Sequence, residues 1–274
     1  MKRVAKRNAT FQRWSTLLNN RTKRHRAGEM IVHGVRPITM AVRAGLPVRS
    51  LLFDGRPKPS TWARQLMLAH PDRVVLVAPE LLAELGERDD VPELLAVVAM
   101  PPDDLTRIPS SGAPIVVAFD RPGNPGNIGT LARSVDALGG AALVTTGHSA
   151  DLWDPQAIRA STGAVFSIPA IRLPSHAPLL EWVDAQRRAG MPYQIVGTDE
   201  SGDIPLERAP WAGPVLLVVG SETAGMSAAW RDACDVVVRI PMAGEASSLN
   251  AATAGSITLY EGLRQRAVQR VPRA

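Results

Sequence analysis

Short, Val-rich apolar runs alternate with amphipathic stretches along the chain from residue 38 onward. Apolar positions three or four residues apart predict helices, and continuous apolar runs of about four to eight residues bounded by turn residues predict buried strands. Up to residue 100, this pattern predicts helices at 38–44, 61–69 and 79–85, and strands at 48–53, 74–77 and 94–100.

A second series of the same kind begins at residue 115. Apolar strands separated by helices favour a buried, mostly parallel sheet, so we predict an α/β fold. The strands are expected at 115–119, 141–145, 168–171, 193–197, 215–219 and 236–240, and the helices at 128–138, 179–188, 228–233 and 248–266.

A Pro- and Ser-rich stretch between the two series is the best candidate for a linker. We therefore expect a basic N-terminal extension at 1–26 with an amphipathic stretch near 11–18, and a small α/β domain at 27–106. The linker then occupies 107–114, and a larger parallel-sheet domain occupies 115–274.

Composition excludes several classes of protein. No apolar run approaches the roughly 20 residues of a membrane span, and no apolar signal-peptide core follows the basic start, so we expect a cytoplasmic protein. Cys234 is the single cysteine, which excludes an internal disulfide and a cysteine metal cluster. The 5 histidines are scattered without ligand spacing, so no metal site is expected.

Charge is concentrated at the start of the chain, where nine basic residues precede the first acidic one, Glu29. A cationic segment without compensating acids attracts a polyanion and releases its counterions on binding. A solvated basic tail is the alternative. With a sequence pI near 10.0, the nucleic-acid interpretation is preferred.

Three polar clusters follow predicted strands of the second series, where open α/β sheets bind ligands. The first, at 120–133, is a Gly- and Pro-rich turn with Asn127 as a candidate helix cap and Arg133 on the same helix. It matches neither the dinucleotide fingerprint nor the P-loop, which argues against a nucleotide-dependent oxidoreductase or phosphotransferase.

The second cluster, at 218–227, places Glu222 directly after an apolar strand and between glycines. The third, at 240–250, joins a strand end to Ser248 and Asn250 at the start of an Ala-rich helix. Backbone N–H groups at a helix start can hold a ligand. A purely structural interpretation is also open, because Ser is a good N-cap and Gly serves the turn.

Together these clusters resemble the three ordered motifs of the SpoU (TrmH) family of RNA ribose 2′-O-methyltransferases, over residues 115–266. The motifs are Asn127-Ile128-Gly129 with Arg133, then Gly220-Ser221-Glu222-Thr223-Ala224-Gly225, then Ile240-Pro241-Met242 with Ser248-Leu249-Asn250. The first domain resembles the ribosomal-protein-like RNA-binding domain of rRNA-modifying members over Arg26 to Arg36. It departs from them at His33, where the family often has an acidic residue.

The resemblance implies a SPOUT-type domain with a deep trefoil knot that binds S-adenosylmethionine (AdoMet). The implied cofactor-binding residues are Gly197, Thr198, Gly220, Ile240, Met242 and Leu249. The implied catalytic residues are Arg133, Asn127, Glu222, Ser248 and Asn250, with Arg133 holding a phosphate and stabilising the developing alkoxide, and Glu222 orienting Arg133. The RNA-binding candidates are Arg21, Lys23, Arg24, Arg26 and Arg36.

The implied reaction is methyl transfer from AdoMet to a ribose 2′-OH of ribosomal RNA, with 23S rRNA favoured. A homodimer with a shared active site is also implied. The final predicted helix offers Leu249, Ile257, Leu259, Tyr260 and Leu263 for that contact, and packing of these side chains in the core of one chain is the alternative. Some relatives with this layout confer resistance to ribosome-targeting antibiotics such as thiostrepton or avilamycin. The alternative is a non-catalytic RNA-binding or ribosome-assembly factor on the same scaffold.

Overall fold

The computed structural model describes residues 2–87, 91–245 and 248–269. The chain divides into two compact units. Unit 1 comprises Met1–Pro101 and Trp153–Ser167, and unit 2 comprises Pro102–Leu152 and Ile168–Ala274.

Unit 1 is built on a five-stranded mixed sheet with the order β1-β4-β3-β5-β2. Strands β1, β4 and β3 are parallel, and β5 pairs antiparallel with both β3 and β2. The bounds are β1 (Lys2–Val4), β2 (Glu29–His33), β3 (Val48–Phe53), β4 (Val74–Val77) and β5 (Leu94–Ala99).

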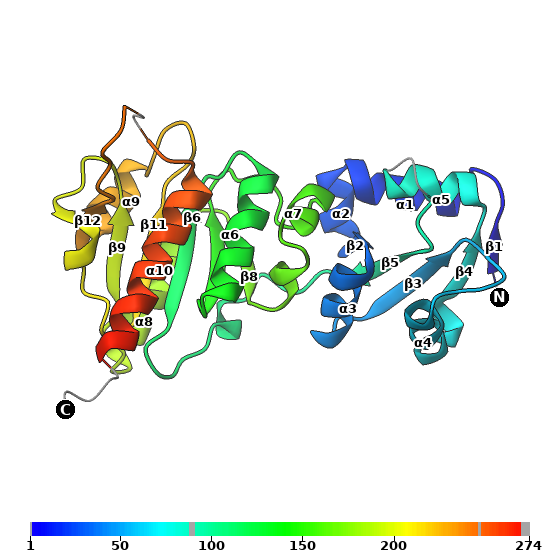
Figure 1. Cartoon of the computed structure of the whole chain (residues 1–274), viewed down its shortest axis with the longest axis horizontal. Coiled ribbons are helices and arrows are strands. Elements are labelled where there is room, and N and C mark those ends of the chain that lie inside the picture. The colour runs from blue at the N-terminus through cyan, green and yellow to red at the C-terminus, as the bar shows by residue number, and fades with distance from the viewer. Residues whose placement is uncertain (1, 88–90, 246–247, 270–274) are drawn as a thin grey trace. The chain divides into compact units, whose positions relative to one another are not determined.

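Helices cover both faces of this sheet: α1 and α5 lie on one side, and α3 and α4 on the other (Figure 1). Apolar side chains of α1 and α5, including Phe11, Trp14 and Leu82, pack on Leu52, Val75 and Val97 of the strands. The helices are α1 (Ala9–Asn19), α2 (Arg21–Ala27), α3 (Val35–Arg43), α4 (Thr61–Ala69) and α5 (Pro79–Gly86), with a 3₁₀ turn η1 (Pro71–Arg73).

Unit 1 differs from the expected division of the chain in two places. Residues before 27 form β1, α1 and α2 and contribute to the core, because β1 pairs with β4 and α1 buries its apolar face. Residues 153–167 also belong to unit 1, with α7 (Pro155–Ala160) against β2 and η3 (Ala164–Phe166) against α3. Gly163 allows the second contact, because a Cβ there would lie 2.7 Å from the Pro37 Cα.

Unit 2 contains a seven-stranded, all-parallel sheet with the order β10-β12-β9-β11-β6-β7-β8. Strand β11 lies between β6 and β9, so the strands that follow β6 in the sequence are found on both sides of it in the sheet. The bounds are β6 (Ile115–Asp120), β7 (Ala142–Thr146), β8 (Ala170–Leu173), β9 (Gln194–Thr198), β10 (Ile204–Pro205), β11 (Val215–Val219) and β12 (Val236–Arg239).

The helices of unit 2 cover the sheet on both faces. On one face, Leu179 and Val183 of α8 (Ala177–Arg188) and Trp230 of α9 (Ala228–Ala233) join the buried strand residues. Elsewhere α10 (Ala251–Gln269) packs along α6 (Pro125–Ala137) and β11. A Cβ at Gly255 of α10 would lie 2.9 Å from Leu131 of α6. This close packing places the start of α10 beside the start of α6. Two 3₁₀ turns, η2 (Leu105–Arg107) and η4 (Leu206–Arg208), complete the unit.

The predicted α/β fold with a parallel sheet is confirmed, and the predicted strands and helices of both series are present to within a few residues. The trefoil knot stays a prediction. No helix among the described residues is long and apolar enough to cross a membrane.

Candidate active site

The carboxyl ends of β9, β11 and β12 surround a cavity of about 440 Å³ in unit 2. It lies beside the point where β11 separates β6 from β9, which is the usual ligand position in an open parallel sheet. The loop after β11 and the segment leading into α10 complete its wall. Two of the three sequence clusters therefore meet in one cavity.

Five of the six predicted cofactor-binding residues line this cavity: Thr198, Gly220, Ile240, Met242 and Leu249. Gly197 does not. A Cβ at Gly197 would lie 2.7 Å from the Cys234 Sγ and 2.8 Å from the Met226 Cε, so this glycine permits close packing inside the unit. Its assignment as a cofactor contact stays a prediction, and the packing against Cys234 and Met226 gives the glycine a structural reason of its own.

Gly220 has a structural reason of its own. A Cβ at this position would overlap the backbone of Gly225 and Met226, because the loop after β11 folds back on itself. Ser221 and Gly225 close that loop with reciprocal backbone hydrogen bonds of 2.9 and 3.1 Å. The close backbone approach that requires glycine at position 220 is therefore made by the chain itself.

A chain of side-chain hydrogen bonds links the three motifs. Asn127 Nδ2 donates to Glu222 Oε1 at 2.7 Å, and Asn250 Nδ2 donates to Asn127 Oδ1 at 3.1 Å. The Asn127 amide thus donates through its nitrogen and accepts through its oxygen. Glu222 and Ser248 also line the cavity, so this chain of contacts reaches its wall.

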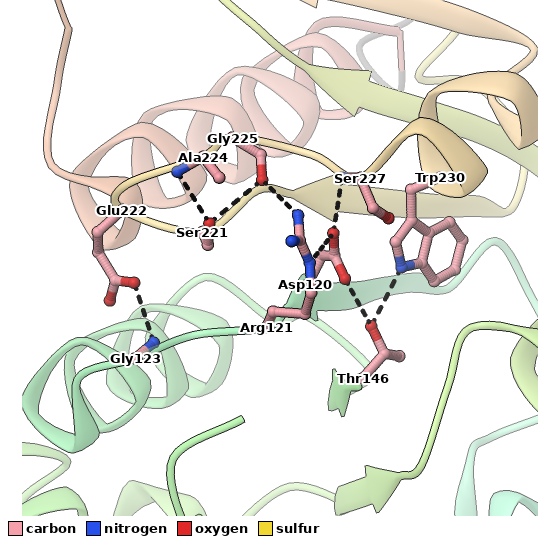
Figure 2. Close-up of polar contacts among 10 residues, drawn as sticks. All are labelled: Asp120, Arg121, Gly123, Thr146, Ser221, Glu222, Ala224, Gly225, Ser227 and Trp230. Carbon is pink, nitrogen blue, oxygen red and sulfur yellow. Dashed lines mark hydrogen bonds and ion pairs between the residues drawn. The ribbon is translucent and has the colours of Figure 1, made fainter. Parts of the chain in front are cut away.

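The Glu222 carboxylate is held in its ionised form. Burial raises its pKa, but hydrogen bonds from Asn127 and from the backbone N–H of Gly123, the latter at 3.0 Å, outweigh that effect. The net result is a pKa below the ordinary value. Figure 2 shows Glu222 reaching toward Gly123 at the turn before α6.

The helix caps differ from those expected. Asn124, not Asn127, caps α6 by accepting a hydrogen bond from the Gly126 N–H at 2.7 Å. Asn250 precedes α10, and its Oδ1 accepts from the Ala252 and Thr253 N–H groups at 3.0 and 3.2 Å. The Asn250 side chain therefore caps the helix through Oδ1 and contacts Asn127 through Nδ2, while its catalytic role stays a prediction.

Arg133 lies apart from this cluster. Its side chain is exposed on α6 and makes no hydrogen bond or ion pair with any residue that the structure describes. Within one chain, the described contacts of Glu222 are with Asn127 and Gly123 rather than with Arg133, so the orienting role of Glu222 stays a prediction.

Sequence reasoning missed a second network, centred on Asp120 at the end of β6 (Figure 2). The Asp120 carboxylate is 3% exposed and accepts hydrogen bonds from the Ser227 N–H at 2.8 Å, Arg121 Nε at 3.1 Å and Thr146 Oγ1 at 3.4 Å. Arg121 has a φ of 49°, and its Nη2 donates to the Gly225 carbonyl at 3.3 Å. Asp120 and Arg121 thus hold the 225–227 end of the 221–227 loop. The sequence feature that could have indicated this network is the acidic residue directly after an apolar run.

The predicted RNA-binding residues lie in unit 1, and one of them is corrected. Arg24 is 2% exposed, and its guanidinium donates to the Leu17 and Leu18 carbonyls and pairs with Asp154 at 3.5 Å. It therefore stabilises unit 1 and is removed from the RNA-binding set. Arg21 is half-buried, and the remaining candidates, Lys23, Arg26 and Arg36, are exposed.

Two other expectations concern reactive and metal-binding groups. Burial, with the neighbouring Asp235 charge, raises the pKa of the Cys234 thiol to about 12, so it stays protonated. Among the described residues, no three His, Cys, Asp or Glu side chains gather as a metal site would require.

Comparison with known proteins identifies the class of this chain. Residues 114–260 match the SpoU rRNA Methylase family, and residues 8–96 match the SpoU L30e-like domain. The chain belongs to the SpoU rRNA methylase family, as the motifs indicated.

One relative and two solved structures illustrate the match. The chain is 53% identical over 266 residues, 97% of this chain and 93% of the relative, to the 23S rRNA (uridine(2479)-2′-O)-methyltransferase of Streptomyces viridochromogenes. A crystal structure of the SpoU methyltransferase AviRb from that organism, in complex with AdoMet, has a TM-score of 0.91 and covers 95% of this chain and 99% of AviRb. An AdoMet-bound rRNA methyltransferase from Sinorhizobium meliloti has a TM-score of 0.85 at 26% identity, and the match covers 96% of this chain and 98% of that protein.

Proposed function

We propose that this chain transfers a methyl group from AdoMet to a ribose 2′-OH of ribosomal RNA, in the large-subunit 23S rRNA. The observation behind the proposal is the cavity at the ends of β9, β11 and β12, with the Asn250–Asn127–Glu222 chain of hydrogen bonds at its wall. Support comes from the 53% identical relative named as a 23S rRNA 2′-O-methyltransferase and from the AdoMet-bound structure of AviRb.

The residues of the cavity suit AdoMet. Its described lining includes three acidic residues, Asp199, Glu200 and Glu222, and no lysine or arginine, so it favours a cationic ligand. Its apolar wall, formed among others by Val219, Val238, Ile240, Met242 and Leu249, fits an adenine ring. When bound, AdoMet supplies an electrophilic methyl group on a positively charged sulfur.

The chain's own contribution is positioning. Asn127, Glu222 and Asn250 fix the turn before α6, the loop after β11 and the start of α10 relative to one another. Ser248 lines the cavity and offers a hydroxyl to the cofactor or the ribose. Holding the reactants in a fixed geometry removes much of the entropic barrier of a bimolecular transfer.

Arg133 is assigned to the active site of a second copy. Its exposed guanidinium has no partner among the described residues of its own chain, and it does not line the cavity. In the active site of that second copy, Arg133 would hold the RNA phosphate and stabilise the developing alkoxide. The adjacent helix α10 exposes Ile257, Tyr260 and Leu263, at 37%, 55% and 40%, for the dimer contact. Leu259 is 0% exposed, so it packs within its own chain and leaves the set of expected dimer contacts.

Unit 1 supplies RNA binding through Lys23, Arg26, Arg36 and Arg21. An enzyme that modifies ribosomal RNA works where ribosomes are made, so we place it in the cytoplasm. We also propose resistance to a ribosome-targeting antibiotic such as avilamycin or thiostrepton, as in some relatives with this layout, and drug susceptibility of a host expressing the chain measures it.

Transfer of a tritiated methyl group from AdoMet to unmodified 23S rRNA, free and in assembled subunits, tests the proposal. Ribose 2′-O-methylation is the expected product. The first nucleotide to be checked for it is uridine 2479, the position in the relative's name. Methylation of a base would contradict it. A chain that binds rRNA but neither binds nor consumes AdoMet would instead be a non-catalytic RNA-binding or assembly factor.

A further inference from the structure

Unit 1 contains a second hollow, of about 640 Å³, far along the chain from the cavity already described. It is formed by β1, the start of α1, the start of β3, η1 and β4, at the β1–β4 edge of the sheet (Figure 1). Five of its lining side chains are cationic, and one is acidic, Asp72. The cations are Lys2, Arg3, Arg13, Arg49 and Arg73.

The cations come from four separate segments that only folding brings together. Lys2 and Arg3 reach the hollow because β1 pairs with β4. Arg49 is the extra residue of an irregularity in the β3–β5 ladder, where the register shifts between Val48 and Ser50. Such a bulge redirects a side chain that regular pairing would place elsewhere.

The positive charge of the hollow is only partly neutralised. Arg13 and Arg49 share the one carboxylate of Glu29, at 2.6 and 3.9 Å. The charged groups of Lys2, Arg3 and Arg73 are exposed and make no hydrogen bond or ion pair with the described residues. The first turn of α1, whose Asn8 and Thr10 also line the hollow, has no acidic residue, so the helix dipole adds to the positive field.

We propose that this hollow binds the phosphodiester backbone of the substrate RNA, with Lys2, Arg3 and Arg73 as its phosphate contacts. The inference rests on the proposed function for the identity of the RNA. A hollow of this size lined by dispersed cations suits several consecutive phosphates better than one small anion, and guanidinium groups bind phosphate oxygens in pairs. None of these three residues belongs to the RNA-binding set at 21–36, so the hollow is a second RNA contact on unit 1.

The test uses the full chain with the three proposed phosphate contacts replaced, K2Q/R3Q/R73Q. A matched control, R43Q/K58Q/R64Q, removes the same charge from exposed positions of unit 1 outside the hollow. Affinity for a 23S rRNA transcript is measured over a range of salt concentrations, and AdoMet affinity and thermal unfolding show that both variants are folded.

Log affinity falls linearly with log salt, and each lost phosphate contact makes this dependence less steep by about 0.7–0.9. The slope of the hollow variant should therefore be shallower than that of the wild type by about 2, and its affinity about tenfold weaker. The control keeps the wild-type slope. Equal slopes for the hollow variant and the control would overturn the proposal. Inorganic phosphate could instead protect the wild type, but not the hollow variant, against unfolding while the RNA slopes of both variants stay equal. That result would also overturn the proposal, because the hollow would then be a small-anion site.

The binding measurement does not depend on catalysis, so the two proposals fail separately. A wild-type chain that binds the transcript with the expected slopes but transfers no methyl group contradicts the proposed function alone. A wild-type chain that methylates the transcript while the hollow variant binds like the control contradicts the second contact alone.

Discussion

Asn127 and Glu222 are 95 residues apart in the sequence and form a hydrogen bond of 2.7 Å. Asn127 donates, and the carboxylate accepts. Because Asn127 Oδ1 accepts from Asn250 at the same time, the direction of both bonds is fixed. A reversal of the Asn127–Glu222 bond should therefore be tolerated only when both residues change.

Asn127→Asp places two carboxylates in contact. We expect it to lower the free energy of unfolding by about 1 kcal/mol and to reduce methyl transfer strongly. Adding Glu222→Gln reverses the bond: the amide introduced at position 222 donates to the carboxylate introduced at position 127, while its oxygen still accepts from the Gly123 N–H. The double variant should regain most of the lost stability in urea unfolding. A double variant no better than Asn127→Asp would show that the two residues do not act as a pair.

The lowered pKa of Glu222 predicts a pH dependence of stability. A carboxyl whose pKa is lower in the folded chain stabilises the fold above its ordinary pKa, near 4.5, and this contribution is lost as the pH falls through the lowered value. The difference in unfolding free energy between the wild type and Glu222→Gln should be largest near neutral pH and shrink below pH 4.5. A difference that stays constant from neutral to acidic pH would mean that the charge is not what stabilises the loop.

Arg133→Ala should abolish methyl transfer while AdoMet still binds by calorimetry. If sites are shared between two copies, mixing this variant with an equally inactive Asn250→Ala chain restores one intact site in each mixed dimer. Random exchange then gives about a quarter of wild-type activity, because half of the dimers are mixed and each has one working site of two. No recovery in dimers shown to have exchanged would contradict the shared site.

Gly220→Ala should destabilise unit 2 by about 3 kcal/mol or more and weaken AdoMet binding, because its Cβ would overlap the backbone of Gly225 and Met226. Gly213→Ala is the matched control. A Cβ there meets nothing within 4 Å, so a change within about 0.5 kcal/mol is expected in thermal unfolding.

Asp120→Asn keeps one acceptor oxygen, which can still face the Ser227 N–H and Arg121 Nε, but it turns a donor toward Thr146 Oγ1 and removes the negative charge that pairs with Arg121. We expect AdoMet to bind more weakly, with a loss of about 1–3 kcal/mol in stability, because the buried group loses a partner and the 221–227 loop is released. The exposed Asp232→Asn serves as control and should leave AdoMet affinity unchanged.

The sequence predicted the cavity better than it predicted contacts inside it. Thr198 and Gly220 directly follow predicted parallel strands and Ile240 ends another. The carboxyl ends of such strands share one edge, so their meeting required only the fold class. The partner of Glu222 was not predictable, because Asn127 and Arg133 differ in helix face and the spacing alone did not show which face meets the loop.

The sequence also failed to predict which polar side chains are buried and where a short helix belongs in the fold. Arg24 looks like its neighbours in a basic run, and its burial depends on the Leu17 and Leu18 carbonyls, which no local pattern reveals. The six-residue helix α7 lacks a full amphipathic repeat, so its place in unit 1 was invisible before the fold was known. Asp120 was assigned to the polar cluster that follows the predicted strand at 115–119, and its burial became evident only from its hydrogen-bond partners.

The position of β11 between β6 and β9 also constrains how the chain acquires its structure. Val215 pairs with Ile115, about 100 residues earlier, and with Gln194 on its other side, so neither neighbour can complete its ladder before this strand arrives. Pairing across such long loops is slow to form because the entropy of closing the loop is lost first. During synthesis, the catalytic half of the molecule therefore matures late, after most of its sheet is already out of the ribosome.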